Sequence, residues 1–329
     1  MTRRIVVIGG GQNAEHDVSL ATARAVAEAL HSSGFDVDEL TIDRDGMWRR
    51  GADALGSQAT SSLAAALSVI ERADVVFPAV HGPSGEDGTL AALCALAHKP
   101  MVGSGLRAGA LGMDKWATKL VAEAVGIHTA PGRLAAAEIA DIEFETDVVV
   151  KPASAGSSFG VALARDAAQL RDALRCAARF DDRILIEDVV LGREIDVAVL
   201  READGCRWAS PPLEIQTNGL FDTQSKYDGS ARFSVPADID SADRAALTGA
   251  ALRMFDALGC AGVARIDFFL TDHGPVLNEV NTMPGMTAES QVPRMFATAG
   301  LPYERLVARL VDAATVPGPT SPGSEGVTP

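Results

Sequence analysis

The sequence has few aromatic residues and no long apolar run. Aromatic residues make up 5% of its 329 positions, although hydrophobic residues reach 47%, so Ala, Val and Leu must fill most of the core. No stretch approaches the roughly 18 uninterrupted apolar residues that a membrane-spanning helix needs. The apolar run at residues 5–8 is also too short for the core of a signal peptide and predicts a first strand instead. We therefore expect a cytoplasmic protein without membrane partners.

Positive charge and cysteine are also scarce. The chain has 29 Lys and Arg residues against 44 Asp and Glu residues, a formal net charge of −15. Nucleic-acid-binding proteins usually carry a basic surface, so this balance disfavours a nucleic-acid partner. The four cysteines form no CxxC pair, and we expect reduced thiols rather than a disulfide framework or a zinc site.

Predicted strands and helices alternate through the N-terminal third of the chain, with a tight turn at residues 9–11 after the first strand. This alternation is typical of a parallel α/β (Rossmann-like) domain. The predicted strands cover residues 5–8, 35–42 and 74–80, and the predicted helices cover residues 17–31, 63–70 and 90–97.

The remaining pattern predicts two further units and a tail. The chain length suits two or three domains. The central unit has strands at 147–151, 161–164 and 184–189 and a helix from Ala167 capped by Asp166; the third has a strand at 194–200, a helix from Ser241 to Gly259 and a hairpin. A tail rich in Pro, Gly, Ser and Thr is expected to be disordered. The predicted boundaries are 1–104, 105–191, 192–315 and 316–329.

The C-terminal hairpin carries the strongest chemical signal. Side chains two positions apart share a face of a strand, so Arg265 lies beside Asp267, and Glu279 lies beside Asn281. A three-residue loop at 272–274 sets Asp267 opposite Glu279, whereas a two- or four-residue loop would put the two acids on opposite faces. Two carboxylates and an amide oxygen suit Mg²⁺, and the arginine suits an anionic transition state. The competing hypothesis is an ordinary solvated hairpin face.

Two strand ends in the central unit suit a nucleotide. Lys151 leaves an apolar strand and precedes a Gly/Ser loop at 156–160, whose backbone N–H groups can surround a phosphate. The loop lacks the Gly-Lys-Ser/Thr of a Walker A motif, and an ordinary hairpin turn would also fit the pattern. Glu187 ends another apolar strand, where an acid can accept from adenine or ribose; a solvated acid at a strand end would fit as well.

Two features of the N-terminal unit suggest a ligand site. Residues 9–14 match a Gly-x-Gly-x-x-Ala dinucleotide fingerprint, which would suit a nicotinamide-dependent oxidoreductase. However, the next residue is Glu15, whose charge would repel a pyrophosphate and suit the ammonium of an amino acid; Glu15 could also be a helix-capping acid. His81 follows a buried strand, at the sheet edge where α/β proteins bind ligands, or is a structural histidine.

Together these motifs resemble the D-alanine–D-alanine ligase family of the ATP-grasp superfamily. The resemblance extends from about residue 5 to residue 311, and six motifs in the family's order make it specific. The segments that carry it are residues 14–20, 81–90, 113–115, 151–160, 226–227 and 278–287.

The resemblance implies a three-domain ATP-grasp architecture, with ATP bound between the central and C-terminal domains. It also implies a homodimer, and two Mg²⁺ ions for which Mn²⁺ can substitute. The residues matched to ATP binding are Lys115, Lys151, Glu187, Glu194 and Lys226, and those matched to metal binding are Asp267, Glu279 and Asn281.

The remaining matched residues concern the amino-acid substrates. Glu15 would face the first ammonium group, and a hydrogen-bonded link from Glu15 to Ser157 and Tyr227 would close a mobile lid over the site, expected at 220–233. An oxyanion hole would be formed by Arg265 and the backbone N–H of Gly285. The other substrate-binding residues implied are His81, near the first substrate, and Ser290, at the second substrate's carboxylate.

The activity implied is that of a cell-wall enzyme making a peptidoglycan precursor. One carboxylate is activated as an acyl phosphate and then joined to the amine of a second D-alanine. Gln291 departs from the pattern, because family members commonly have Leu or Met there. Its amide suits a polar second substrate or solvent, so D-serine, D-lactate or the amine of a specialised metabolite could replace the second D-alanine. Tyr227 favours an amine. The competing functions are those of an oxidoreductase and of a non-catalytic binding protein.

Overall fold

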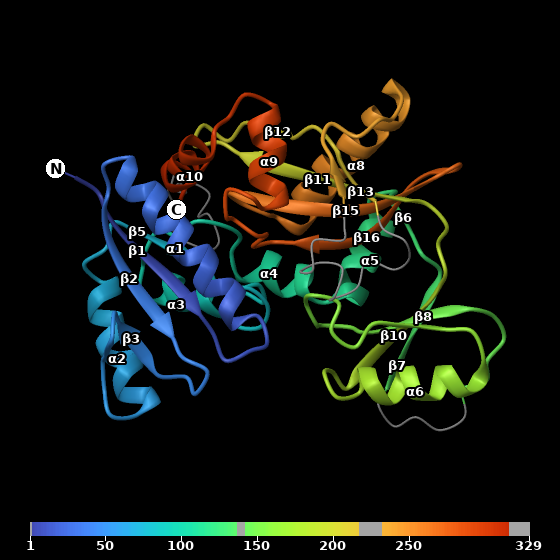
Figure 1. The fold of residues 1–329 in the computed structure, drawn as a ribbon, viewed down its shortest axis with the longest axis horizontal. Helices are drawn as coiled ribbons and strands as arrows, with labels where there is room; N and C mark the ends of the chain where they lie inside the picture. The colour runs from blue at the N-terminus through green and yellow to red at the C-terminus, as the bar shows by residue number, and fades with distance from the viewer. Residues whose placement is uncertain (1, 137–141, 217–231, 316–329) are drawn as a thin grey trace, which may run out of the picture.

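The computed structural model describes residues 2–136, 142–216 and 232–315, which form three β-sheets with helices packed around them (Figure 1). Four predictions concern parts of the chain outside these ranges. They are the roles of Lys226 and Tyr227, most of the lid expected at 220–233, and the tail at 316–329.

The N-terminal sheet has the predicted parallel centre. Its strands lie in the order β4-β3-β2-β1-β5, and β1 pairs in parallel with both β2 and β5. Alternate residues of β1 are buried against α1 on one face and against α2 and α3 on the other, as expected for an all-apolar strand. An antiparallel edge of β3 and β4 was not predicted. The elements are β1 (Arg4–Gly10), α1 (His16–Ser32), β2 (Asp36–Ile42), β3 (Trp48–Arg50), β4 (Asp53–Ala54), α2 (Ala59–Ile70), β5 (Val75–Pro78) and α3 (Thr89–Leu96).

The tight turn predicted at residues 9–11 was placed too early. Gly9 and Gly10 still belong to β1, because the parallel pairing with β2 continues to Gly10 opposite Ile42. Gly10 has φ +81°, and a Cβ on it would lie 2.3 Å from the carbonyl oxygen of Ile42. A glycine is therefore required by the close approach of two strands.

The central sheet is antiparallel throughout, in the order β7-β10-β8-β9. Helix α6 packs against β8 and β9, and the predicted cap is confirmed, because the Asp166 carboxylate accepts from the backbone N–H groups of Ala168 and Gln169. Its elements are β7 (Gly132–Ala136), β8 (Val148–Pro152), β9 (Ala162–Ala164), α6 (Ala167–Ala177) and β10 (Arg183–Asp188).

The C-terminal sheet has the order β14-β13-β11-β15-β16-β6, with β12 paired to β11. Helix α8 packs on one face, and helices α9 and α10 cover part of the other. The predicted end of α8 at Gly259 is confirmed, since Gly259 has φ +73°. The strands are β6 (His128–Thr129), β11 (Arg193–Arg201), β12 (Arg207–Ala209), β13 (Leu213–Gln216), β14 (Arg232–Ser234), β15 (Val263–Thr271) and β16 (Gly274–Asn281); the helices are α8 (Ser241–Leu258), α9 (Gln291–Thr298) and α10 (Tyr303–Asp312).

The hairpin of β15 and β16 has the predicted register but not the predicted loop. Thr271 pairs with Gly274, so the loop has two residues rather than three. By itself this loop would turn the two acids to opposite faces. A β-bulge at Asn278 adds one residue to β16 and restores the alternation, so that Asp267 pairs with Glu279 as predicted.

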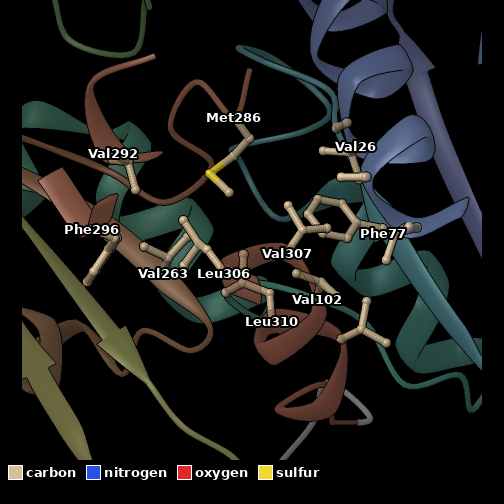
Figure 2. Packing of buried hydrophobic residues seen from close by; sticks show 14 of the residues in the cluster. Val26, Phe77, Val102, Val263, Met286, Val292, Phe296, Leu306, Val307 and Leu310 are labelled. Carbon is tan, nitrogen blue, oxygen red and sulfur yellow. The ribbon is translucent and has the colours of Figure 1, made fainter. Parts of the chain in front are cut away.

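The three sheets do not have three separate cores. Residues of the N-terminal and C-terminal sheets share one apolar cluster, in which Val26 and Phe77 face Val307 and Leu310 of α10 (Figure 2). The central sheet is packed around its own cluster with α6. Helices α4 (Leu106–Met113) and α5 (Lys115–Ala124) pack with α8 and β16 of the C-terminal part, and the predicted boundary at residue 105 stays a prediction.

Candidate active site

Two adjoining cavities contain every predicted site residue that the described ranges include. One lies between the central and C-terminal sheets, and the other lies between the N-terminal loops and the loop after β16. Arg265 and Glu279 line both cavities. The first is lined by Lys115, Lys151, Glu187, Glu194 and Asp267, and the second by Glu15, His81, Ser157, Asn281, Gly285, Ser290 and Gln291.

A buried ion cluster adjoins the first cavity, which two of its members, Lys151 and Glu187, line. Glu187 lies between two lysines, with Oε1 2.6 Å from Lys119 Nζ and Oε2 2.5 Å from Lys151 Nζ. Burial alone would raise the pKa of Glu187, but the charges of Lys151 and Lys119 outweigh it and lower the pKa. Lys119 was missed by the sequence reasoning. Its signal is its spacing, since it lies four positions after Lys115 on one face of α5.

The Gly/Ser loop is tied to the rest of the site by Lys115. The Lys115 ammonium donates to the carbonyl oxygen of Ala155 at 2.7 Å and lies 3.3 Å from Glu279 Oε2. Ser157 and Ser158 both have positive φ, at 48° and 57°. Such conformations cost on the order of 1 kcal/mol or more for residues other than glycine and cluster at functional sites. Two consecutive positive φ angles also define a type I′ turn, and across it the Phe159 N–H donates to the carbonyl oxygen of Gly156 at 3.1 Å, so the phosphate-binding role of the loop stays a prediction.

The hairpin face is held by an arginine. Arg265 donates from Nε to Asp267 Oδ1 at 2.7 Å and from NH2 to Asp267 Oδ2 at 2.8 Å. Asn281 Nδ2 donates to the same Oδ2 at 2.9 Å. Burial alone would lower the pKa of Arg265, but the charges of Asp267 and Asp196 raise it, so the guanidinium stays charged. This face is a charged, buried cluster rather than a solvated surface.

The oxygen donors of the hairpin fit a magnesium ion that shares its coordination with phosphate. Asp267 and Glu279 are directly paired across the two strands, and both are hard ligands. Within the described ranges, no group of three or more His, Cys, Asp or Glu side chains is arranged to hold a metal ion. Two acids and an amide leave octahedral positions that nucleotide phosphates and water would have to fill.

Glu15 presents a buried carboxylate to the second cavity. It precedes α1 at the N-cap position, but its side chain makes no capping hydrogen bond, so it does not act as a helix-capping acid. The carboxylate lies in a narrow space between two glycines. A Cβ on Gly82 would lie 2.8 Å from Oε2, and one on Gly156 would lie 3.0 Å from Oε1. A buried negative charge in such a place suits a positively charged ligand group.

His81 joins three parts of the second cavity. Its Nε2 lies 2.9 Å from Thr22 Oγ1, and its Nδ1 lies 3.0 Å from the carbonyl oxygen of Met283 and 3.6 Å from Glu86 Oε1. Burial would lower the pKa of His81, but the nearby carboxylates of Glu86 and Glu15 raise it. Glu86 was not singled out from the sequence, although it lies within the 81–90 motif.

The loop after β16 is fixed from two sides. Tyr303 of α10 donates its hydroxyl to the carbonyl oxygen of Met286 at 2.6 Å, and Ser290 Oγ accepts from the backbone N–H of Thr287 at 3.1 Å. A Cβ on Gly285 would lie 3.1 Å from Ser290 Oγ, so a side chain at Gly285 would press on Ser290. Tyr303 was missed, because nothing in its local sequence relates it to a loop far from its helix.

Comparison with known proteins identifies both halves of the chain. Residues 4–104 match the family described as D-ala D-ala ligase N-terminus, and residues 127–312 match D-ala D-ala ligase C-terminus. The D-alanine–D-alanine ligase of Mycobacterium sp. (strain KMS) is 38% identical, over 96% of this chain and 97% of that protein. The enzyme of the same name from Mycobacterium tuberculosis (strain CDC 1551 / Oshkosh) is 37% identical over 96% of each.

Solved structures resemble the fold over nearly its whole length. The VanG D-Ala:D-Ser ligase from Enterococcus faecalis superimposes with a TM-score of 0.80 at 30% identity, covering 95% of this chain and 99% of that one. The D-alanine–D-alanine ligase from Coxiella burnetii gives 0.79 at 28% identity, covering 95% and 93%. Across the described parts of the chain, none of the helices has the length and apolar character to span a bilayer.

Proposed function

The chain belongs to the D-alanine–D-alanine ligase family, and from that premise we propose how its own residues carry out the reaction. It is an ATP-dependent ligase with the ATP-grasp fold that forms D-alanyl-D-alanine, a precursor of peptidoglycan. A different second substrate and a nicotinamide-dependent oxidoreductase are not favoured. The observation that carries the assignment of roles is that a cavity lined by Lys115 and Lys151 and a cavity lined by Glu15 and Ser290 meet at Arg265 and Glu279.

ATP would bind in the first cavity, with its phosphates toward the hairpin. Lys115 and Lys151 are buried cations near Glu279 and Asn278, where they would neutralise phosphate charge. Glu187 and Glu194 would accept hydrogen bonds from the nucleoside, and Lys226 would add a further cation. Asp267, Glu279 and Asn281 would hold two Mg²⁺ ions, for which Mn²⁺ can substitute. When bound, the metal supplies further charge neutralisation.

The first step joins a D-alanine carboxylate to phosphate. The ammonium group would pair with Glu15 and the substrate would lie beside His81, which sets the carboxylate toward the first cavity. A carboxylate oxygen forms a bond to the γ-phosphorus while the bond to the β–γ bridging oxygen breaks, so ADP leaves and an acyl phosphate remains. Water would hydrolyse this intermediate, and closure through Ser157 and Tyr227 would exclude it.

The second step forms the peptide bond. The amine of the second D-alanine, with its carboxylate at Ser290, attacks the acyl carbon. Arg265 and the backbone N–H of Gly285 would stabilise the negative charge that develops on the carbonyl oxygen. The C–O bond to phosphate then breaks, phosphate leaves, and the amine loses a proton. We also propose a homodimer in the cytoplasm, as the family resemblance implies.

The test is phosphate release from MgATP with defined substrates. D-alanine alone should give rapid release and a dipeptide detectable by mass, whereas D-alanine with D-serine or D-lactate should add little mixed product. Release only with a mixed pair would keep the chemistry and overturn the product. Glu279→Gln should abolish turnover, and unchanged turnover would remove Glu279 from the metal site and favour a binding protein.

A further inference from the structure

The side-chain amide of Gln291 has two partners inside the protein. Gln291 is the first residue of α9, and its Nε2 donates to Asp196 Oδ2 at 3.0 Å. Its Oε1 accepts from Arg265 NH1 at 2.9 Å. The reversed amide would set its NH₂ group against the charged Arg265 guanidinium, and that contact would be repulsive. The orientation of the amide is therefore determined by the protein.

Asp196 is the most deeply buried member of this group. It lies on β11 with 2% of its surface exposed, and it is paired across the strands with Asp267. Both carboxylates face the same arginine, since Arg265 Nε is 3.4 Å from Asp196 Oδ2. A buried carboxylate requires donors, and Gln291 supplies one of them. Gln291 on α9 thus supplies a donor to the buried Asp196 on β11, and Asp196 accepts one of the two hydrogen bonds that hold the Gln291 amide.

The consequence concerns the freedom of Arg265. Its Nε and NH2 are committed to Asp267, and its NH1 is committed to Gln291. A planar guanidinium that is held at all three nitrogens has a single orientation. Each terminal nitrogen keeps one further N–H that can donate to a ligand. A group fixed before the reaction needs no reorganisation when charge develops near it.

We propose that Gln291 and Asp196 are positioning residues that orient Arg265 toward the reacting carbonyl, and that Gln291 does not select the second substrate by a hydrogen bond of its own. The inference rests on the ligation proposed above. It also explains how a polar residue at position 291 is compatible with D-alanine as the second substrate.

The test is Gln291→Met, which keeps the length of the side chain and removes both hydrogen bonds. We expect kcat for D-alanine ligation to fall about tenfold, the size of effect of one charge-assisted hydrogen bond, with the acceptor KM changed less than about twofold. The preference for D-alanine over D-serine should not change. Gln169→Met, on an exposed position of α6, is the matched control and should behave as wild type.

A second variant tests the route of the effect. If Gln291 acts through the buried cluster, Asp196→Ala and Gln291→Met should be strongly non-additive in kcat. Additive effects, or a raised acceptor KM with a changed D-alanine to D-serine preference, would make Gln291 a direct substrate contact and overturn the proposal. If Asp196→Ala does not fold, the kcat and KM of Gln291→Met decide alone.

Failure of the inference is distinguishable from failure of the proposed function. Wild-type protein that forms the dipeptide while Gln291→Met matches it in kcat and KM overturns only the positioning role. Wild-type protein that releases no phosphate with any substrate pair overturns the ligation, and the positioning role with it.

Discussion

The N-terminal and C-terminal sheets share one apolar core, whereas the central sheet has its own. Helix α10 makes the difference, because it packs against α1 and its apolar residues share one cluster with residues of β1, β5 and the C-terminal sheet (Figures 1 and 2). The active-site residues are divided between the same two parts of the molecule. Lys151, Ser157 and Glu187 belong to the central part, while Glu15 and Asp267 belong to the shared-core part.

This difference indicates which part of the site is rigid and which can move. The second cavity is lined mostly by residues of the N-terminal and C-terminal parts, together with Gly156 and Ser157 of the central part. The nucleotide cavity is joined across the divide by polar contacts, including Lys115 with the Ala155 carbonyl and Lys151 with Asn278 at 3.3 Å. Hydrogen bonds across an interface break more readily than a shared core, so we expect the central part to close over ATP by moving against a fixed remainder.

The largest expected effect is on activity, and it comes from a residue of the shared-core part. Asp267→Asn removes a carboxylate of the predicted metal site and the charged partner of Arg265. We expect kcat to fall about 10²–10³-fold, as on removal of a key electrostatic group. Phosphate release with D-alanine measures this, and the thermal unfolding curve is the control for folding. A less than tenfold loss would contradict the placement of the metal on this hairpin.

The next prediction tests the two cores directly. Phe77→Ala in the shared core should cost about 3–5 kcal/mol and Leu174→Ala in the central core about 2–5 kcal/mol, from lost burial and a cavity. Hydrogen exchange should show Phe77→Ala weakening protection in both the N-terminal and C-terminal sheets, and Leu174→Ala weakening only the central sheet. Equal weakening everywhere by Leu174→Ala would mean that the three sheets unfold as one unit.

A smaller effect is expected where α5 meets the central sheet. Lys119→Met removes one of the two cations on Glu187 and leaves Lys151 as its partner. Lys151 is then held more tightly away from phosphate, so we expect KM for ATP to rise about tenfold, with a smaller change in kcat. Arg171→Met, which removes a positive charge from the exposed face of α6, is the control. A KM equal to that of wild type would show that Lys119 does not affect the nucleotide.

The smallest expected effect concerns the pH dependence of the unfolding free energy and comes from His81 in the shared-core part. Because the pKa of His81 is raised in the folded protein, its protonated form stabilises the fold. This contribution is fully present below the unfolded pKa of about 6.5 and is lost as pH rises through the higher folded pKa. The difference in unfolding free energy between wild type and His81→Gln should therefore be larger at acidic than at alkaline pH. A constant difference would contradict the raised pKa.

Local pattern predicted the elements better than their connections. The cap at Asp166 and the end of α8 at Gly259 depend on neighbouring residues and were predicted correctly. The predicted length of the hairpin loop was wrong although the predicted pairing of Asp267 with Glu279 was right, because the bulge at Asn278 forms only against the partner strand. Asp196 was overlooked for the same reason, since its importance comes from Arg265 and from Gln291 on a different element.

The sequence by itself determined the chemistry: the acids, lysines and glycines of each motif are residue types that phosphate, metal and ammonium groups require, and their order along the chain identifies the family. The tertiary structure alone decided which sheets share a core, how Lys119 and Tyr303 support the site, and that Gln291 turns toward Asp196 and Arg265. Residue chemistry and spacing are properties of the local chain. A side chain's partners depend on contacts between segments far apart in sequence, which exist only after the chain has packed.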